Sequence, residues 1–513
     1  MDEYFKQILQ ARVYDIAIES PLDKADSLSK RFNNKIYLKR EDLQPVFSFK
    51  LRGAFNKMYN LSEDERSKGV ITSSAGNHAQ GVALSALKLN CRATIVMPLT
   101  TPEVKINAVK NLKAKVILHG DNYDECHEKA IKICQNENST FIHPFDDPLV
   151  IAGQGTIGIE IVKQIKQPPY AIYLAIGGGG LASGVGTYIK NIWPDVKVIG
   201  VEPKDAQAMN LSLIKNNRVS YENPGLFADG VAVKRVGKIT FELTKKYIDE
   251  IITVDTDEIC AAIKDTYEDT RSILEPAGAL SIAGMKKDIK NKNLNSKSLI
   301  AIACGANMNF ERLRFVAERA ELGERREAMF AVEIPETAGS LRNLCKIIGN
   351  RNLSEFSYRM SKEDKAQIFI GIQVKGDIDK EELKDDFQRN NFKYLDLTDD
   401  ELSKIHIRHM VGGRLPSGIN TLDKTYKELL YRFNFPERPG ALMKFLNKLN
   451  PDWSISIFHY RNHGADIGRI VIGIIIKEQD IELWQKFIKN IGYKFWDESN
   501  NKAYQLFLAS QKP

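Results

Sequence analysis

The sequence AIYLAIGGGGLASG, residues 171–184, contains the pattern that decides the fold of this chain. Its first six residues form a continuous apolar run, which predicts a strand that is buried on both faces. Four consecutive glycines follow, and small or apolar residues at helical spacing begin near Leu181. A buried strand that passes through a glycine turn directly into a helix is the unit from which parallel α/β sheets are built.

The alternation of strands with helix-length segments extends outward from this stretch, from about residue 36 to about residue 320. Helical spacing of small and apolar residues marks, for example, residues 78–89 and 126–137. We therefore predict an α/β fold in this region, with parallel sheets covered by helices on both faces. The other strand candidates are residues 36–40, 69–73, 92–98, 115–120, 197–203 and 299–304.

A sequence repeat replaces this pattern after residue 325. The turn motif PE..G.L begins at Pro335 and again at Pro436, and its glycines are Gly339 and Gly440. Each copy predicts the order β-α-β-β-α-β over about 80 residues. The sequence thus predicts one large α/β domain and two smaller, duplicated domains, with the limits 1–325, 326–404 and 425–513.

Composition excludes several classes of function. The 513 residues carry 73 basic and 66 acidic side chains, a net charge of +7, with no run of basic residues, so we expect no nucleic-acid partner. No window reaches the roughly 18 apolar residues of a membrane span, and the first residues lack the apolar core of a signal peptide. Six cysteines without metal-ligand spacing predict no metal site and a reducing compartment. We expect a cytoplasmic protein.

The motif SFKLRG, residues 48–53, places Lys50 at the start of a predicted helix, directly after the apolar Phe49. A lysine that forms a Schiff base must be largely neutral when its amine attacks. Partial burial beside the positive end of a helix lowers the pKa of such an amine. Lys50 is therefore a candidate nucleophile for an aldehyde.

Two further motifs join predicted strands to predicted helices. In TSSAGNHAQG, residues 72–81, the backbone amides of the junction lie beside the Ser74 and Asn77 side chains and form an anion site suited to a carboxylate. The glycine run at 177–180 lets successive amides converge on one phosphate at a helix N-terminus. Because neither the dinucleotide pattern GxGxxG nor the ATP pattern GxxxxGK[ST] is present, a ligand with a single phosphate fits better.

Two motifs near the end of the α/β region add polar side chains. Glu275 lies in LEPAGAL, and Cys304 lies at the end of the strand candidate 299–304. In open α/β sheets, ligands bind outside the carboxyl ends of the strands, where all four motifs fall. Together they describe one site for an aldehyde cofactor that carries one phosphate.

This set of motifs resembles the biosynthetic threonine deaminases of the isoleucine pathway. The resemblance rests on SFKLRG, SAGNHAQG, GGGGL, ILEPAGAL, CGANMNF, ELGERRE and the two PE..G.L repeats, and it covers almost the whole chain. These enzymes depend on pyridoxal 5′-phosphate and have the tryptophan-synthase-β fold, with ACT-like regulatory subdomains at the C-terminus. The resemblance implies conversion of L-threonine to 2-oxobutanoate and ammonia, the first committed step of isoleucine biosynthesis.

The resemblance also implies roles for single residues. Lys50 would hold the cofactor as a Schiff base and act as the base for the substrate's Cα proton, and Asn77 would bind the cofactor's 3′-oxygen. Cys304 would face the pyridine nitrogen, where relatives often carry serine, and as a neutral group it would leave the ring a weaker electron sink than a carboxylate would. The phosphate would be bound by Gly177, Gly178, Gly179, Gly180 and Leu181, and the substrate by Ser74, Gly76 and His78.

The two repeats are implied to bind isoleucine as an inhibitor, with valine opposing it, in a homotetramer. Aromatic residues occupy matching positions in the two copies, and we expect them either to line effector pockets or to pack against the helices. These residues are Phe356, Tyr358, Phe458 and Tyr460.

Four alternatives remain. A racemase of the same fold needs a second acid–base group where this chain has Ala75, whose methyl group cannot move a proton. A catabolic serine/threonine dehydratase usually lacks two long C-terminal repeats. A non-catalytic amino-acid sensor would leave the complete set of site motifs unexplained. The fourth alternative is that the repeats serve only in oligomerisation, because paired β-α-β-β-α-β units often only associate.

Overall fold

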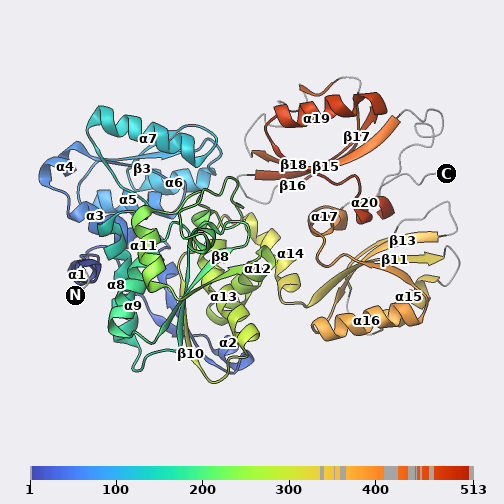
Figure 1. Ribbon diagram of the computed structural model, residues 1–513, viewed down its shortest axis with the longest axis horizontal. Coiled ribbons are helices and arrows are strands. Elements are labelled where there is room, and N and C mark those ends of the chain that lie inside the picture. The colour runs from blue at the N-terminus through green and yellow to red at the C-terminus, as the bar shows by residue number, and fades with distance from the viewer. Residues whose placement is uncertain are drawn as a thin grey trace. The chain divides into compact units, whose positions relative to one another are not determined.

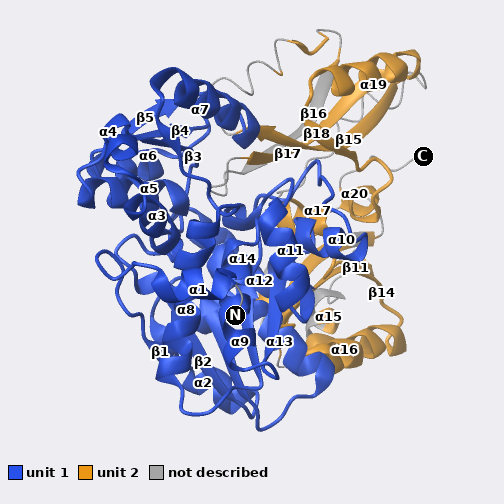
Figure 2. Cartoon of the chain, turned by 60° about the vertical axis from the view of Figure 1, so that its left-hand side comes forward, with its two compact units in different colours: residues 1–320 blue, residues 321–513 orange. Residues whose placement is uncertain are grey.

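The computed structural model describes residues 3–335, 340–349, 351, 353–358, 365–409, 426–436, 445, 448–450, 453–461 and 467–507. The chain divides into two compact units, residues 1–320 and 321–513 (Figure 2). The first unit has the α/β pattern and the second contains the repeats, as Figure 1 shows by the alternation of helices and strands along the chain.

The larger sheet of the first unit has six strands in the order β1-β2-β10-β7-β8-β9. Strands β2, β10, β7, β8 and β9 are parallel to their neighbours, and β1 pairs with β2 in the antiparallel direction at the edge. The carboxyl ends of the parallel strands therefore share one edge of the sheet. The strands are β1 (Leu22–Lys24), β2 (Lys35–Arg40), β7 (Ala171–Ala175), β8 (Lys197–Pro203), β9 (Glu250–Val254) and β10 (Ser298–Ala303).

The smaller sheet has four parallel strands in the order β5-β4-β3-β6. The predicted parallel α/β fold is confirmed, and β1, β6 and β9 are strands that the sequence pattern did not reveal. Each of these three is short or only half buried, so a continuous apolar run is missing. The strands are β3 (Val70–Ser73), β4 (Ala93–Met97), β5 (Lys115–Leu118) and β6 (Thr140–Phe141).

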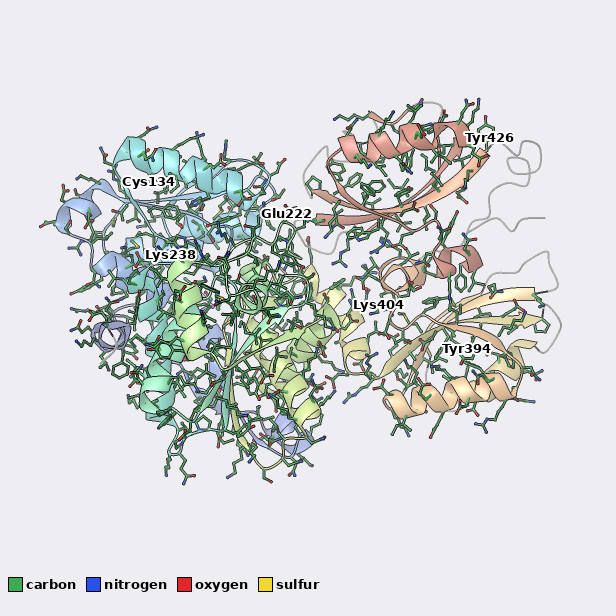
Figure 3. All side chains as sticks on the ribbon, viewed as in Figure 1. Cys134, Glu222, Lys238, Tyr394, Lys404 and Tyr426 are labelled. Carbon is green, nitrogen blue, oxygen red and sulfur yellow. The ribbon has the colours of Figure 1, made fainter. Side chains whose placement is uncertain are left out.

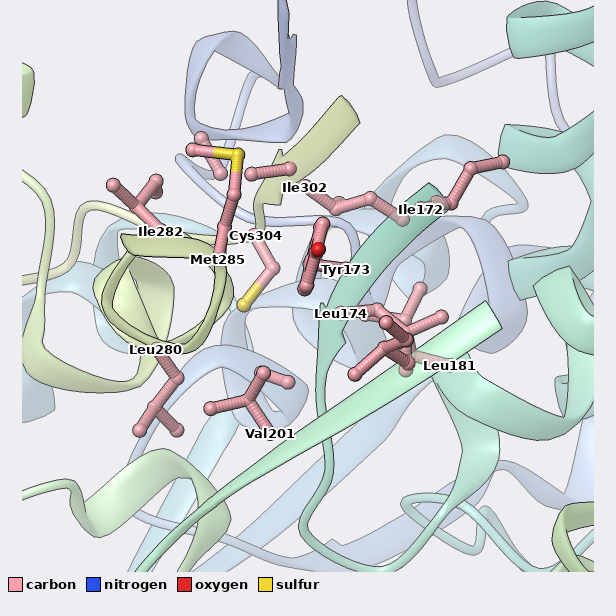
Figure 4. Close-up of a cluster of buried hydrophobic side chains, with 14 of the residues drawn as sticks. Ile172, Tyr173, Leu174, Leu181, Val201, Leu280, Ile282, Met285, Ile302 and Cys304 are labelled. Carbon is pink, nitrogen blue, oxygen red and sulfur yellow. The ribbon is translucent and has the colours of Figure 1, made fainter. Parts of the chain in front are cut away.

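Fourteen helices of the described chain begin within the first unit. The helices around the larger sheet form one large core with its central strands, and Figure 4 shows part of it, with Tyr173 of β7 and Cys304 labelled among the buried side chains. The helices beside the smaller sheet pack with its strands in separate clusters. The helices are α1 (Glu3–Gln10), α2 (Asp26–Arg31), α3 (Lys50–Tyr59), α4 (Glu63–Lys68), α5 (Asn77–Lys88), α6 (Glu103–Asn111), α7 (Tyr123–Glu137), α8 (Pro148–Gln164), α9 (Gly180–Ile192), α10 (Ala208–Ile214), α11 (Lys238–Tyr247), α12 (Thr256–Thr270), α13 (Pro276–Lys292) and α14 (Arg312–Gly323).

The second unit contains two four-stranded antiparallel sheets with matching strand orders, β12-β13-β11-β14 and β16-β17-β15-β18. The duplication extends to a backbone irregularity, because the pairing shifts at Leu353/Glu355 in one copy and at Ile455/Ile457 in the other. The strands are β11 (Glu327–Pro335), β12 (Leu353–Tyr358), β13 (Lys365–Gln373), β14 (Lys393–Asp396), β15 (Tyr426–Pro436), β16 (Ser454–Arg461), β17 (Ile467–Lys477) and β18 (Lys494–Asp497).

Helices pack on one face of each sheet, over separate apolar cores. A third cluster, which includes Phe369 of β13 and Val471 of β17, buries the opposite faces of both sheets. The helices are α15 (Ser340–Ile348), α16 (Asp377–Arg389), α17 (Glu401–Ile405), α19 (Ile481–Asn490) and α20 (Lys502–Phe507). Gly339, Gly440 and the side chains of Phe356, Tyr358, Phe458 and Tyr460 lie outside the described residues.

Candidate active site

Lys50 is the first residue of α3, directly after β2 and a short connecting segment. Its Nζ atom donates a hydrogen bond to the Pro144 carbonyl oxygen at 3.0 Å. Burial of the amine lowers its pKa to about 8, because the charged form loses solvation, while the nearby Cys304 and Glu275 partly oppose this shift. The helix that carries it packs closely, since a Cβ atom at Gly53 would lie 2.4 Å from Gln154 Nε2. Lys50 thus presents an amine that is easily made neutral.

The glycine run lies at the carboxyl end of β7 and leads directly into α9. Gly179 has φ +98°, a left-handed conformation that favours glycine, and α9 begins at Gly180. The loop is tightly packed, because a Cβ atom at Gly178 would lie 2.2 Å from the Phe145 ring. Thr240 Oγ1 donates to the Gly178 carbonyl oxygen at 2.6 Å, which fixes the peptide planes of the turn. The turn and the helix N-terminus together form a cradle for an anion.

Asn77, the first residue of α5, is held at both ends of its side-chain amide. Its Nδ2 atom donates to Glu275 Oε1 at 2.5 Å, and its Oδ1 atom accepts from Asn307 Nδ2 at 2.6 Å. Asn307 Nδ2 also donates to the Val46 carbonyl oxygen at 2.8 Å. One amide proton of Asn77 remains for a ligand in this arrangement.

Glu275 is buried, and the pKa of its carboxyl group is shifted toward neutral pH. Burial raises its pKa to about 7, and the negative charge of Asp229 adds to the rise, while the hydrogen bond from Asn77 opposes it. Asp229 itself is ion-paired with Lys105 at 2.8 Å and with Arg312 at 3.4 Å. The site therefore contains a carboxyl group that is able to exchange a proton near neutral pH.

The predicted substrate residues of the TSSAGNHAQG turn differ in their surroundings. Ser74 Oγ accepts a hydrogen bond from the Gly76 amide at 3.2 Å, and both residues are half buried. No atom lies within 4 Å of a Cβ atom built at Gly76, so its backbone borders open space. His78 is buried, and its Nε2 atom lies 2.9 Å from the Ile142 carbonyl oxygen, which favours a structural role over a substrate contact.

Cys304 follows β10 directly, at the same edge of the sheet as the glycine run. Its Sγ atom contacts the Ala277 carbonyl oxygen at 3.4 Å. Burial raises the pKa of the thiol far above its ordinary value, so the side chain stays a neutral thiol at physiological pH. It offers a ring nitrogen a weak, uncharged partner.

These residues fit the cofactor that the sequence predicts. A phosphorylated pyridine aldehyde needs an amine for its aldehyde, an anion site for its phosphate and a partner for its ring nitrogen. The lysine amine of lowered pKa, the glycine turn at the N-terminus of α9 and the neutral buried thiol are groups of these three kinds. Among the residues that the structure describes, no group of three or more histidine, cysteine, aspartate or glutamate side chains is arranged to hold a metal ion.

Matches to known protein families define the class of this chain. Residues 13–305 match the family of pyridoxal-phosphate dependent enzymes. Residues 318–407 and 421–508 match the C-terminal regulatory domain of threonine dehydratase.

Full-length relatives narrow the class. The chain is 52% identical over 510 residues to the biosynthetic L-threonine dehydratase of Burkholderia multivorans, covering 99% of each sequence. It is 49% identical to the chloroplastic biosynthetic threonine dehydratase of Arabidopsis thaliana, covering 99% of this chain and 84% of that one. The chain therefore belongs to the biosynthetic threonine dehydratases, which are pyridoxal-phosphate-dependent enzymes.

Solved structures agree with this assignment. The processed form of threonine deaminase isoform 2 from Solanum lycopersicum superposes with a TM-score of 0.61 at 51% identity, covering 62% of this chain and 92% of that chain. A serine racemase from Dictyostelium discoideum is 31% identical with a TM-score of 0.55, covering 60% of this chain and 99% of that one.

In the described part of the chain, no helix has the length and apolar character needed to cross a membrane.

Proposed function

We propose that this chain converts L-threonine to 2-oxobutanoate and ammonia at the site around Lys50. The observation that carries the proposal is that burial lowers the pKa of the Lys50 amine. The candidate site of Lys50 also contains the glycine run and Asn77. When bound, pyridoxal phosphate supplies an electron sink for the bonds at the substrate's Cα atom.

The chain's own residues would hold the cofactor and the substrate. The amides of Gly177, Gly178, Gly179, Gly180 and Leu181 would bind the phosphate, Asn77 the 3′-oxygen, and Cys304 the ring nitrogen. The N-terminus of α5, with Gly76 and Ser74, would bind the substrate carboxylate, because the helix has no side-chain cap at Gly76 and its dipole favours an anion.

Lys50 would move the proton at the substrate's Cα atom. An amine with a pKa of about 8 is partly neutral at pH 7 to 8, and a general base works best when its pKa is near the working pH. The neutral Cys304 thiol would favour prompt loss of the β-hydroxyl group, since a thiol does not stabilise a protonated ring nitrogen as a carboxylate would.

We propose further that the two repeats bind isoleucine as an inhibitor and valine as its antagonist. The match of residues 318–407 and 421–508 to the regulatory domain supports this role. The same proposal includes a homotetramer, a cytoplasmic location and the domain limits 1–325, 326–404 and 425–513. The aromatic residues at matching positions of the repeats remain candidates for the effector pockets.

The decisive experiment adds L-threonine to the purified protein with pyridoxal phosphate and assays 2-oxo acid, with and without isoleucine. We expect 2-oxobutanoate and ammonia in equal amounts, and inhibition by isoleucine. A parallel mixture that contains L-serine instead of threonine, analysed for the two serine enantiomers, separates the racemase alternative, which predicts D-serine. Absence of 2-oxo acid from a protein that binds the cofactor would favour the sensor alternative instead.

A further inference from the structure

The segment HPFDD, residues 143–147, connects four elements around the candidate site. It follows β6 and precedes α8, and its Pro144 carbonyl oxygen accepts the hydrogen bond from Lys50 Nζ. Asp147 caps α8, since its Oδ1 atom accepts from the Leu149 amide at 2.8 Å. The segment is therefore in direct contact with the Lys50 amine and is fixed to the long helix α8.

The middle of this segment also holds the glycine run. The Phe145 ring covers the turn so closely that a Cβ atom at Gly178 would overlap it. Asp146 accepts hydrogen bonds from the first amides of α11, at 2.8 Å from Lys238 N and 2.9 Å from Ile239 N. Figure 3 labels Lys238 at this end of α11. Because Thr240 of α11 in turn binds the Gly178 carbonyl oxygen, the segment fixes the glycine run from two sides.

His143 holds the conformation of this segment. Its Nδ1 atom accepts two backbone hydrogen bonds, from Phe145 N at 3.2 Å and from Asp146 N at 2.7 Å. A nitrogen that accepts two such bonds carries no proton, so the imidazole must be neutral with its proton on Nε2. The ring also packs edge-on against Phe145, with ring centroids 4.7 Å apart.

We propose that His143 is a positioning residue of the enzyme, which sets the place of the Pro144 carbonyl oxygen and of Phe145, and through them the place of the Lys50 amine relative to the glycine run. The inference rests on the proposed function of Lys50. Lys50 would bind the aldehyde and the glycine run the phosphate of one molecule, so the position of one relative to the other tolerates little displacement. A shift of about 1 Å can cost about a hundredfold in rate.

The test compares His143→Ala with His143→Asn in the full chain. An asparagine carbonyl oxygen is able to accept from the amides two and three residues ahead, as Nδ1 does here, whereas alanine offers no acceptor. We expect His143→Ala to lower kcat by about tenfold to a hundredfold and to weaken binding of pyridoxal phosphate to the cofactor-free protein, measured by absorbance titration. His143→Asn should recover most of both properties.

His127→Asn is the matched control. His127 packs edge-on against Phe141, as His143 does. Its Nδ1 atom lies 3.4 Å from the Ser73 hydroxyl oxygen, and among the described residues no backbone amide donates to its ring. We expect this variant to lose ring packing and some thermal stability while it keeps kcat and cofactor affinity.

Three results would overturn the inference: a His143→Ala protein with unchanged cofactor affinity and kcat, a His143→Asn protein as impaired as the alanine variant, or a control with the same losses. A Lys50→Ala protein measured in parallel separates this failure from failure of the proposed function. If Lys50→Ala still turns over threonine, the proposed function is wrong. If Lys50→Ala is inactive and His143→Ala is normal, only the positioning role is wrong.

Discussion

Arg52 and Glu41 form an ion pair that is fully buried and joined by two hydrogen bonds, Nε to Oε2 and Nη2 to Oε1, both at 2.8 Å. Arg52 also binds Glu160 at 2.6 Å, and Glu160 binds Lys39 at 2.6 Å. The cluster contains two cations and two carboxylates, so its charges balance. Because Arg52 lies two residues after Lys50 on α3, the cluster anchors the helix that presents Lys50.

Arg52→Met is expected to destabilise the protein by about 3–5 kcal/mol, because it leaves Glu41 and Glu160 buried with only Lys39 to compensate them. Denaturant unfolding monitored by circular dichroism measures the change. Lys24→Met is the control, since the Lys24–Asp26 pair is exposed and its loss should change stability little. Equal stability of the Arg52→Met protein and the wild type would show that the cluster is not an anchor.

Lys50→Ala is expected to abolish turnover and to leave cofactor binding partly intact, because the phosphate and ring contacts come from other segments. Assay of 2-oxo acid measures the first effect, and retention of pyridoxal phosphate after gel filtration measures the second. Substantial elimination activity in this variant would contradict the assignment of Lys50.

The lowered pKa of Lys50 predicts a pH dependence for cofactor attachment. Only the neutral amine attacks an aldehyde, so the rate for cofactor-free protein should rise about tenfold per pH unit below 8 and level off above it. An ordinary lysine would continue to gain reactivity up to about pH 10.4. Stopped-flow absorbance after mixing with pyridoxal phosphate gives the profile, and a rise that continues beyond pH 9 would show that burial does not lower this pKa.

The local motifs of the site were predictable because each is contiguous in sequence. The glycine run follows a continuous apolar strand, and Lys50 is the first residue of a helix. The sequence pattern around each motif predicts these positions. Two of the three strands that the pattern missed, β1 and β9, lie at the edges of the larger sheet, where burial on one face leaves no continuous apolar run.

The hydrogen-bond partners within the site were not predictable in the same way. Asn77 meets Glu275 across 198 residues of sequence and Asn307 across 230, and no local periodicity encodes such a pairing. The sequence analysis did not identify His143 as a site residue, although the sequence HPFDD contains a signal for an ordered turn. A histidine and a proline precede two aspartates there, and the second aspartate caps a helix that begins with Pro148. The substrate contact of His78 stays a prediction, and its Nε2 atom contacts the Ile142 carbonyl oxygen.

Cys304→Ser is expected to be tolerated, and Cys304→Asp to harm elimination. Serine keeps a neutral partner of similar size after β10, whereas aspartate would favour a protonated ring nitrogen and with it side reactions such as transamination. The ratio of 2-oxobutanoate formation to cofactor amination, followed by absorbance, is the measurement. An unchanged ratio in Cys304→Asp would show that this residue does not face the ring.

Gly179→Ala is expected to weaken pyridoxal phosphate binding by about tenfold or more. The residue has φ +98°, which costs about 1–3 kcal/mol for a residue with a side chain, and its Cβ atom would lie 2.7 Å from Met209 Cε. Gly186→Ala on the same helix is the control, because its φ is ordinary and its new methyl group would meet side-chain carbons at 3.2 Å. Equal cofactor affinity of the two variants would contradict a phosphate role for the glycine turn.

Removal of the residues after Arg325 is expected to leave threonine turnover and to abolish its inhibition by isoleucine. The first unit has its own large core, so its fold does not depend on the repeats for apolar burial. Inhibition in the full chain requires that isoleucine bind a low-activity state more tightly, and a typical coupling of about 1–3 kcal/mol corresponds to a shift of about 5- to 150-fold. Threonine saturation curves with and without isoleucine, measured for both proteins, give this coupling. If isoleucine inhibited the shortened protein at the concentrations that inhibit the full chain, the effector site would lie in residues 1–325.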